Sequence, residues 1–171
     1  EGAGDAIAVD AVRVSTELLS LVPVLGRSPL QALARIHALA SASSLPEERR
    51  GRPRDAASAD RLRSLAEVLL AETEAPALMV AALVHADLAT AAPFPSHNGI
   101  VARAAERLVL VARGVDPASL TVPEAGHLAH RAAYESNLRG YASGEDSGIH
   151  SWLLYAPEAF ASGADASPLR G

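Results

Sequence analysis

The chain has 171 residues, which is enough for one domain with a hydrophobic core. Hydrophobic residues make up 49% of it and aromatic residues only 4%, so small aliphatic side chains must fill the interior, which favours packed helices over a β-sandwich. The net charge of −5 gives no general attraction for nucleic acid or an anionic membrane. There is no cysteine, which excludes disulfides and thiolate chemistry and agrees with the cytoplasmic location that we expect.

Apolar residues at helical spacing predict the first two helices, over residues 5–25 and 29–40. Ser28 is the expected cap of the second, with Pro29 in its first turn. From 41 to 57 the sequence is polar and interrupted by proline and glycine, so we expect an exposed loop there.

Three further helices are predicted in the middle of the chain, over residues 58–73, 76–91 and 98–113. The last two are strongly apolar, so we expect them to form a central hairpin with the 92–97 loop facing a cleft. The apolar stretch 75–94 is long enough to raise the question of a membrane span, but its ionisable side chains and many alanines favour a buried helix.

Two more helices are predicted, over residues 123–142 and 147–161, the second interrupted or kinked near Pro157. The tail from 162 to 171 is small and polar, and we expect it to be frayed. No segment alternates as a strand would, so the sequence predicts a single all-α domain with its core at about 15–161.

The segment that joins the two central helices carries most of the functional information. It reads TAAPFPSHNGIVARA, from Thr90 to Ala104. Asn98-Gly99 opens a helix whose first N–H groups are free, and asparagine could cap one of them while glycine admits a ligand to the backbone. Arg103 lies one turn further on, so an anion site is possible. The alternative is an ordinary helix start with a solvated arginine.

This segment resembles the signature of the Fic/Doc (Fido) family, His-Pro-Phe-x-Asp-Gly-Asn-Gly-Arg-x-x-Arg. His85 also stands where relatives carry a histidine on the preceding helix, the 43–57 segment resembles their flap, and Trp152 lies on a final helix as in many of them. The resemblance covers about residues 15–161 and implies a Fido fold. The matching signature positions are Pro93, Phe94, Asn98, Gly99 and Arg103.

Four demanding positions of the signature differ in this chain. Ala92 replaces the histidine that accepts a proton, and Ser96 replaces the carboxylate that holds Mg²⁺. His97 replaces the first glycine of the phosphate cradle, and Ile100 replaces the first arginine. In the family these groups support protein nucleotidyl transfer, most often AMPylation from ATP.

The resemblance and its departures together predict a degenerate Fic-like module that binds or scaffolds rather than catalyses. A remnant cleft for an anion or a peptide would use Asn98, Gly99 and Arg103, with a protein or a peptide as the expected partner and neither nucleic acid nor membrane. We expect no cofactor, since ATP and Mg²⁺ are needed only if the chain is a divergent transferase. That transferase, with His97 as a weak candidate for a displaced base, is the alternative, and an unrelated helical bundle is the third.

The remaining histidines have simpler structural explanations. His127 and His130 share a helix face with Glu124 one turn earlier, a spacing that metal sites use. No third ligand is apparent, so we expect a surface pair and no metal site. His85 and His37 lie on apolar helices and are expected to be hydrogen-bonded core residues.

Overall fold

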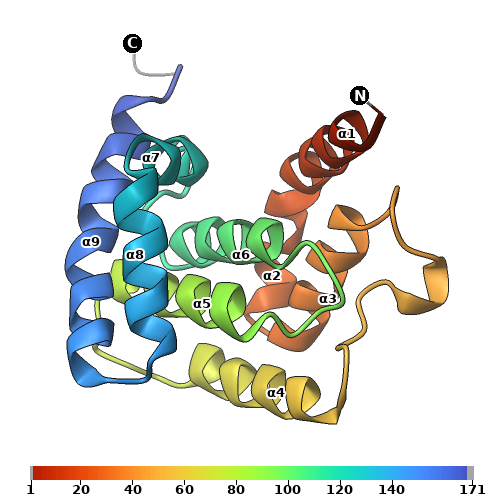
Figure 1. Ribbon diagram of the computed structural model, residues 1–171, viewed down its shortest axis with the longest axis horizontal. Helices are drawn as coiled ribbons and strands as arrows, with labels where there is room; N and C mark the ends of the chain where they lie inside the picture. Colours follow the sequence, from red (N-terminus) through yellow and green to blue (C-terminus); the bar gives the residue numbers. More distant parts are fainter. Residues whose placement is uncertain (1, 169–171) are drawn as a thin grey trace.

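The computed structural model describes residues 2–168, and these form helices joined by loops, with no strand among them (Figure 1). Two short 3-10 helices, η1 and η2, accompany the α-helices. The elements are α1 (Gly2–Glu17), η1 (Leu18–Leu21), α2 (Val22–Leu25), α3 (Pro29–Ala40), η2 (Glu47–Arg49), α4 (Ala56–Leu70), α5 (Ala77–Ala91), α6 (Asn98–Ala112), α7 (Pro123–Ala129), α8 (Arg131–Ala142) and α9 (Asp146–Asp165). The predicted all-α class is therefore confirmed.

The helices α5 and α6 form the predicted hairpin at the centre and pack on each other more extensively than any other pair. Helices α8 and α9 cover α5 on one side, and α2 and α3 cover α6 on the other (Figure 1). The main core lies between the hairpin and α1–α4, and a second cluster surrounds Trp152 of α9. None of the helices within residues 2–168 is long and apolar enough to cross a membrane.

Several predicted boundaries are wrong. The 123–142 helix is broken at His130, whose backbone (φ −112°, ψ 35°) separates α7 from α8. The last helix continues through Pro157 and on to Asp165, so residues 162–165 are not frayed; residues 169–171 lie outside the described part. The first helix gives way to the 3-10 turn η1 after Glu17.

The helix caps also differ from expectation. Ser28 makes no side-chain capping hydrogen bond, although α3 does start at Pro29. Helix α4 begins earlier than predicted because the Asp55 side chain caps it, accepting a hydrogen bond from the Ser58 N–H at 2.8 Å.

Candidate functional site

The loop between α5 and α6 is closed by the side chain of Asn98. Its Oδ1 accepts a hydrogen bond from the Phe94 N–H, and its Nδ2 donates to the Phe94 carbonyl, both at 2.9 Å. The N-cap of α6 is His97, which makes no side-chain capping bond, so the expected capping role of Asn98 is wrong. Asn98 fixes the shape of the loop instead.

Both ends of this loop have left-handed backbone. Ala92 (φ 45°) is the C-cap of α5, and His97 (φ 57°) is the N-cap of α6. Such a conformation costs a residue with a Cβ about 1–2 kcal/mol, so it persists only where the surroundings hold it. The His97 Nδ1 lies 2.7 Å from the Ser96 hydroxyl, and both residues are half-buried. The loop therefore presents Ser96 and His97 together beside the start of α6.

Phe94 anchors the loop in the core, with only 2% of its surface exposed. Its ring stacks on His37 of α3 with the ring centroids 4.4 Å apart, and the His37 Nδ1 accepts a hydrogen bond from the Gly51 N–H at 2.8 Å. The Arg54 N–H donates to the Pro93 carbonyl at 2.9 Å. The segment around Gly51, predicted to be an exposed loop, is thus tied through its backbone to the signature loop, residues 92–97.

The contact between His37 and Gly51 depends on the chemistry of both residues. Burial lowers the pKa of His37 to about 4, and the charge of nearby His97 adds to that decrease. Gly51 has φ 71°, and a Cβ there would lie 2.7 Å from the Ala34 carbonyl oxygen, so only glycine fits. His37 is buried and hydrogen-bonded, as predicted from the sequence.

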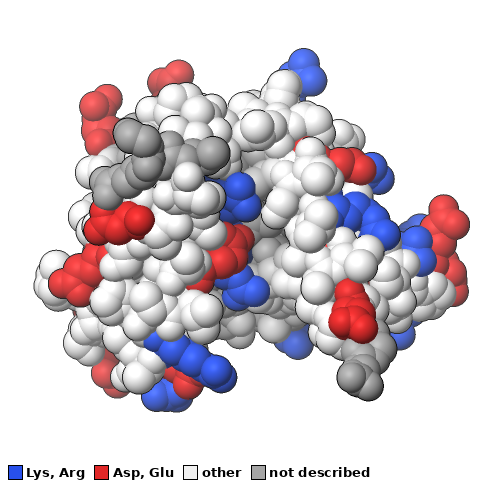
Figure 2. All heavy atoms as spheres, turned by 90° about the horizontal axis from the view of Figure 1, so that it is seen from above, with Lys and Arg blue, Asp and Glu red and all other residues white. Residues whose placement is uncertain are grey.

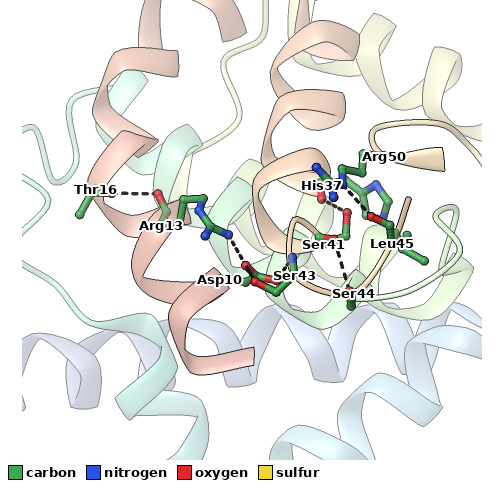
Figure 3. Close-up of polar contacts among 9 residues, drawn as sticks. All are labelled: Asp10, Arg13, Thr16, His37, Ser41, Ser43, Ser44, Leu45 and Arg50. Carbon is green, nitrogen blue, oxygen red and sulfur yellow. Dashed lines mark hydrogen bonds and ion pairs between the residues drawn. The ribbon is translucent and has the colours of Figure 1, made fainter. Parts of the chain in front are cut away.

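A second polar network holds α1 against the loop that follows α3 (Figure 3). The buried Asp10 carboxylate accepts hydrogen bonds from the Ser43 N–H at 3.0 Å and from the Ser43 hydroxyl at 2.8 Å, and it pairs with Arg13. Burial alone would raise the pKa of Asp10, but the Ser43 hydrogen bonds and Arg13 leave it below its usual value. Helix α1 is therefore fixed by a charged group as well as by apolar packing.

A cavity of about 450 Å³ lies between α1 and the start of α6. The α1 wall is largely apolar, and the opposite wall carries Ile100 and two arginines. Figure 2 shows this face of the molecule hollowed between α7–α9 and α1, with basic and acidic side chains along the hollow. A neighbouring cavity of about 400 Å³ shares Arg103 and Glu124 with the first. The two hollows form one groove along α6 and α7.

Arg103 occupies the centre of this groove and turns back toward the start of α6. One of its guanidinium nitrogens lies 3.3 Å from the point that a Cβ on Gly99 would occupy, so the glycine makes room for the charge. Arg103 has no ion-pair partner among residues 2–168, although it makes a side-chain hydrogen bond with Tyr134. The structure brings Gly99 and Arg103 together, but of the predicted site residues Asn98, Gly99 and Arg103 only Arg103 lines the groove.

Two buried polar atoms of the groove-lining residues have no hydrogen-bond partner in the described chain, the Arg107 Nε and the Glu124 Oε2. Arg107 donates to the Ser119 hydroxyl at 3.1 Å, and its nearest approach to Glu124 is 4.0 Å. Unpaired buried donors and acceptors are costly, so a polar ligand or water in the groove would stabilise them.

Beneath the groove lies a cluster of buried ionisable groups. The Glu106 Oε2 is 2.6 Å from the His85 Nδ1 and 3.1 Å from the His127 Nε2. The outer ring nitrogens meet two phenols: the His85 Nε2 is 3.0 Å from the Tyr134 hydroxyl, and the His127 Nδ1 is 2.9 Å from the Tyr155 hydroxyl. Trp152 packs against both imidazoles. The prediction that His85 is a hydrogen-bonded core residue is confirmed.

Electrostatics within the cluster favour an ionised Glu106 carboxylate and disfavour a charged His85 ring. Burial alone would raise the pKa of Glu106, but the two histidines bring it to about 2. Burial lowers the pKa of His85 despite its carboxylate partner. Burial also raises the pKa of the Tyr134 phenol, an effect that Arg103 opposes, so the cluster and the groove are electrostatically linked.

The sequence interpretation of the histidine pair is wrong. His127 is only 4% exposed and points into the cluster, whereas the exposed His130 bonds to the Ser162 hydroxyl at 2.8 Å. The chain breaks between α7 and α8 at His130, so the two histidines do not continue along one helix face. Sequence reasoning also missed Glu106, although a lone carboxylate among the apolar residues of α6 was a signal for it.

Comparison of this chain with protein-family models, curated proteins and solved structures finds no significant match.

Proposed function

We propose that this chain is a degenerate Fic-like module that binds a small anionic molecule in the groove between α1 and α6, without catalysing transfer. Arg103 carries the proposal, because its guanidinium lies against Gly99 beside the positive end of α6 and has no ion-pair partner among the described residues. A planar cation near the positive end of a helix suits a phosphate or a carboxylate.

The rest of the groove supports a ligand larger than a bare ion. Its volume of about 450 Å³ is in the range of small-molecule sites, and Val12 and Leu18 give it an apolar wall opposite the arginines. Arg107 adds a second cation with one unpaired buried N–H. A molecule with an anionic end and an apolar or aromatic body, such as a nucleotide, matches this division.

The signature loop favours binding over chemistry. A methyl group at Ala92 accepts no proton, and Ile100 contributes an apolar side chain to the groove where relatives carry an arginine. His97 is engaged with Ser96 at the helix cap. Losing a general base alone reduces a rate by roughly 100- to 10,000-fold. A cytoplasmic location belongs to the same proposal.

Isothermal titration calorimetry with inorganic phosphate, AMP, ADP, ATP and CDP-choline tests the proposal. We expect saturable binding of at least one nucleotide, weakened roughly 10- to 100-fold in Arg103→Ala, since a charged hydrogen bond contributes about 1.5–3 kcal/mol. Arg113→Ala, at the opposite end of α6, is the matched control and should bind as the parent does.

Two results would overturn the proposal. One is binding that survives intact in Arg103→Ala, or no binding of any probe. The other is Mg²⁺-dependent transfer of labelled nucleotide to the chain or to an added protein, which would support the divergent transferase instead.

A further inference from the structure

The donor atoms of His85, Glu106 and His127 converge on one point in the core. One ligating atom from each lies within 4.8 Å of the other two, and none of the three residues is more than 4% exposed. We infer that these residues form a binding site for a transition-metal dication, with zinc as the expected ion. The three ligands lie beneath the groove and His127 lines part of it, but the inference does not rest on the proposed anion binding.

The donor types select the class of metal. Two imidazole nitrogens and one carboxylate oxygen are a common set for catalytic zinc and for other divalent transition metals, and they leave a coordination position open. Mg²⁺ and Ca²⁺ prefer all-oxygen ligands, so two imidazoles disfavour them. A chain without cysteine offers no thiolate site to compete for zinc.

Side-chain rotation is needed to admit the ion, because the three donor atoms lie within 4.8 Å of one another but are not equally spaced. Donors held about 2.0–2.2 Å from a tetrahedral zinc lie roughly 3.3 Å from one another. The carboxylate oxygen is now 2.6 Å from the His85 nitrogen and 3.1 Å from the His127 nitrogen. The carboxylate and the His85 ring would therefore separate by less than about 1 Å, which side-chain rotation provides.

The two tyrosines fit both the metal-free and the metal-bound forms. Without metal, the contacts allow each imidazole to donate its inner N–H to Glu106 and to accept from a tyrosine hydroxyl through its outer nitrogen. With metal, the inner nitrogens bind the ion, and each proton moves to the outer nitrogen, which donates to the Tyr134 or Tyr155 oxygen. Because a hydroxyl both donates and accepts, neither form leaves a ring nitrogen unpaired, and metal-binding histidines commonly have such partners.

The site also has an approach from the surface. His127 and Tyr134 line the 400 Å³ cavity that opens beside Arg103. Glu124 and Glu135 line the same cavity, so carboxylates offset the charge of the arginines for an entering cation. A water or an anionic ligand could complete the coordination from this side.

Titration of the chelator-treated full chain with Co²⁺ and Zn²⁺ tests the inference. We expect one ion per chain, the visible absorption bands of four-coordinate Co²⁺, and displacement of Co²⁺ by Zn²⁺. Glu106→Gln should weaken binding at least about 100-fold, and Tyr134→Phe roughly 10- to 100-fold. His130→Ala, which removes an exposed histidine three residues from His127, should bind as the parent does.

Circular dichroism of each variant shows whether it folds, and the parent chain decides the question by itself. Failure of the folded parent to bind either ion with one-to-one stoichiometry would refute the site and identify the cluster as a purely hydrogen-bonded one. Binding that Glu106→Gln retains but His130→Ala loses would assign the metal to the surface. The metal titration uses no nucleotide and the nucleotide titrations use no added transition metal, so failure of one proposal is distinguishable from failure of the other.

Discussion

At the scale of single residues, His37 connects the signature loop to the segment around Gly51 and does so only in its neutral form. Its Nδ1 accepts the Gly51 N–H, which a protonated ring cannot do. Its ring also stacks on Phe94 in the core, where burial disfavours a charge. Protonation would therefore act against both contacts.

We expect His37 to make stability depend on pH. Its pKa is about 4 in the folded chain against the usual 6.5, so between these values the unfolded chain binds the extra proton. The contribution of neutral His37 to the free energy of unfolding is complete above pH 6.5 and is lost as pH falls toward 4. By linkage its full size is about 3 kcal/mol.

Urea unfolding at several values between pH 7.5 and pH 4.5 measures this slope. His37→Asn keeps a hydrogen-bond acceptor but does not titrate, so its stability should fall less over the same interval. The exposed His150→Asn is the control and should keep the parent slope. Equal slopes in the parent and in His37→Asn would contradict the prediction.

At the scale of helices, α9 packs on its neighbours at backbone distance through glycines. A Cβ on Gly148 would lie 2.0 Å from the Gly140 carbonyl oxygen of α8, and a Cβ on Gly126 of α7 would lie 1.9 Å from the Ala159 carbonyl oxygen of α9. These contacts set the distance of α9, which carries Trp152, from α7 and α8.

Adding one methyl group at such a contact should push the helices apart. We expect Gly148→Ala to lower the free energy of unfolding by about 3 kcal/mol, because overpacking against rigid backbone leaves little room for relaxation. Gly26→Ala is the matched control, since no atom lies within 4 Å of the point that its Cβ would occupy and the change should stay within about 1 kcal/mol. Similar urea midpoints for the two variants would be inconsistent with close packing.

The presence of the helices was predictable from the sequence, because the spacing of apolar residues that indicates a helix lies within a single segment. The central hairpin and the Gly99–Arg103 proximity followed from residues near one another in the chain. The break at His130 carries no proline or glycine, and it depends on how α7 and α8 each pack on α9. The buried cluster joins His85, Glu106 and His127, which are far apart in sequence, so no single segment disclosed it.

At the scale of the whole molecule, the groove exists because α1 stands beside α6 although about 90 residues separate them. Helix α1 contacts α3 and α6, and several of its apolar side chains remain exposed, including Ile7 and Val9. The Asp10 carboxylate with its two hydrogen bonds to Ser43 therefore contributes much to the position of this wall.

Removing that carboxylate should loosen α1 without unfolding the hairpin. Hydrogen bonds to a charged group contribute about 1.5–3 kcal/mol, so Asp10→Ala should speed amide hydrogen exchange across residues 5–17 by roughly 10- to 100-fold. Exchange in α5 and α6 should stay slow, because their packing does not involve Asp10. Asp5→Ala, which changes an exposed acidic residue on the same helix, is the control.

If residues 5–17 exchange equally slowly in both variants, apolar packing alone holds helix α1 in place. If they loosen and nucleotide binding weakens with them, the position of α1 is part of the binding site.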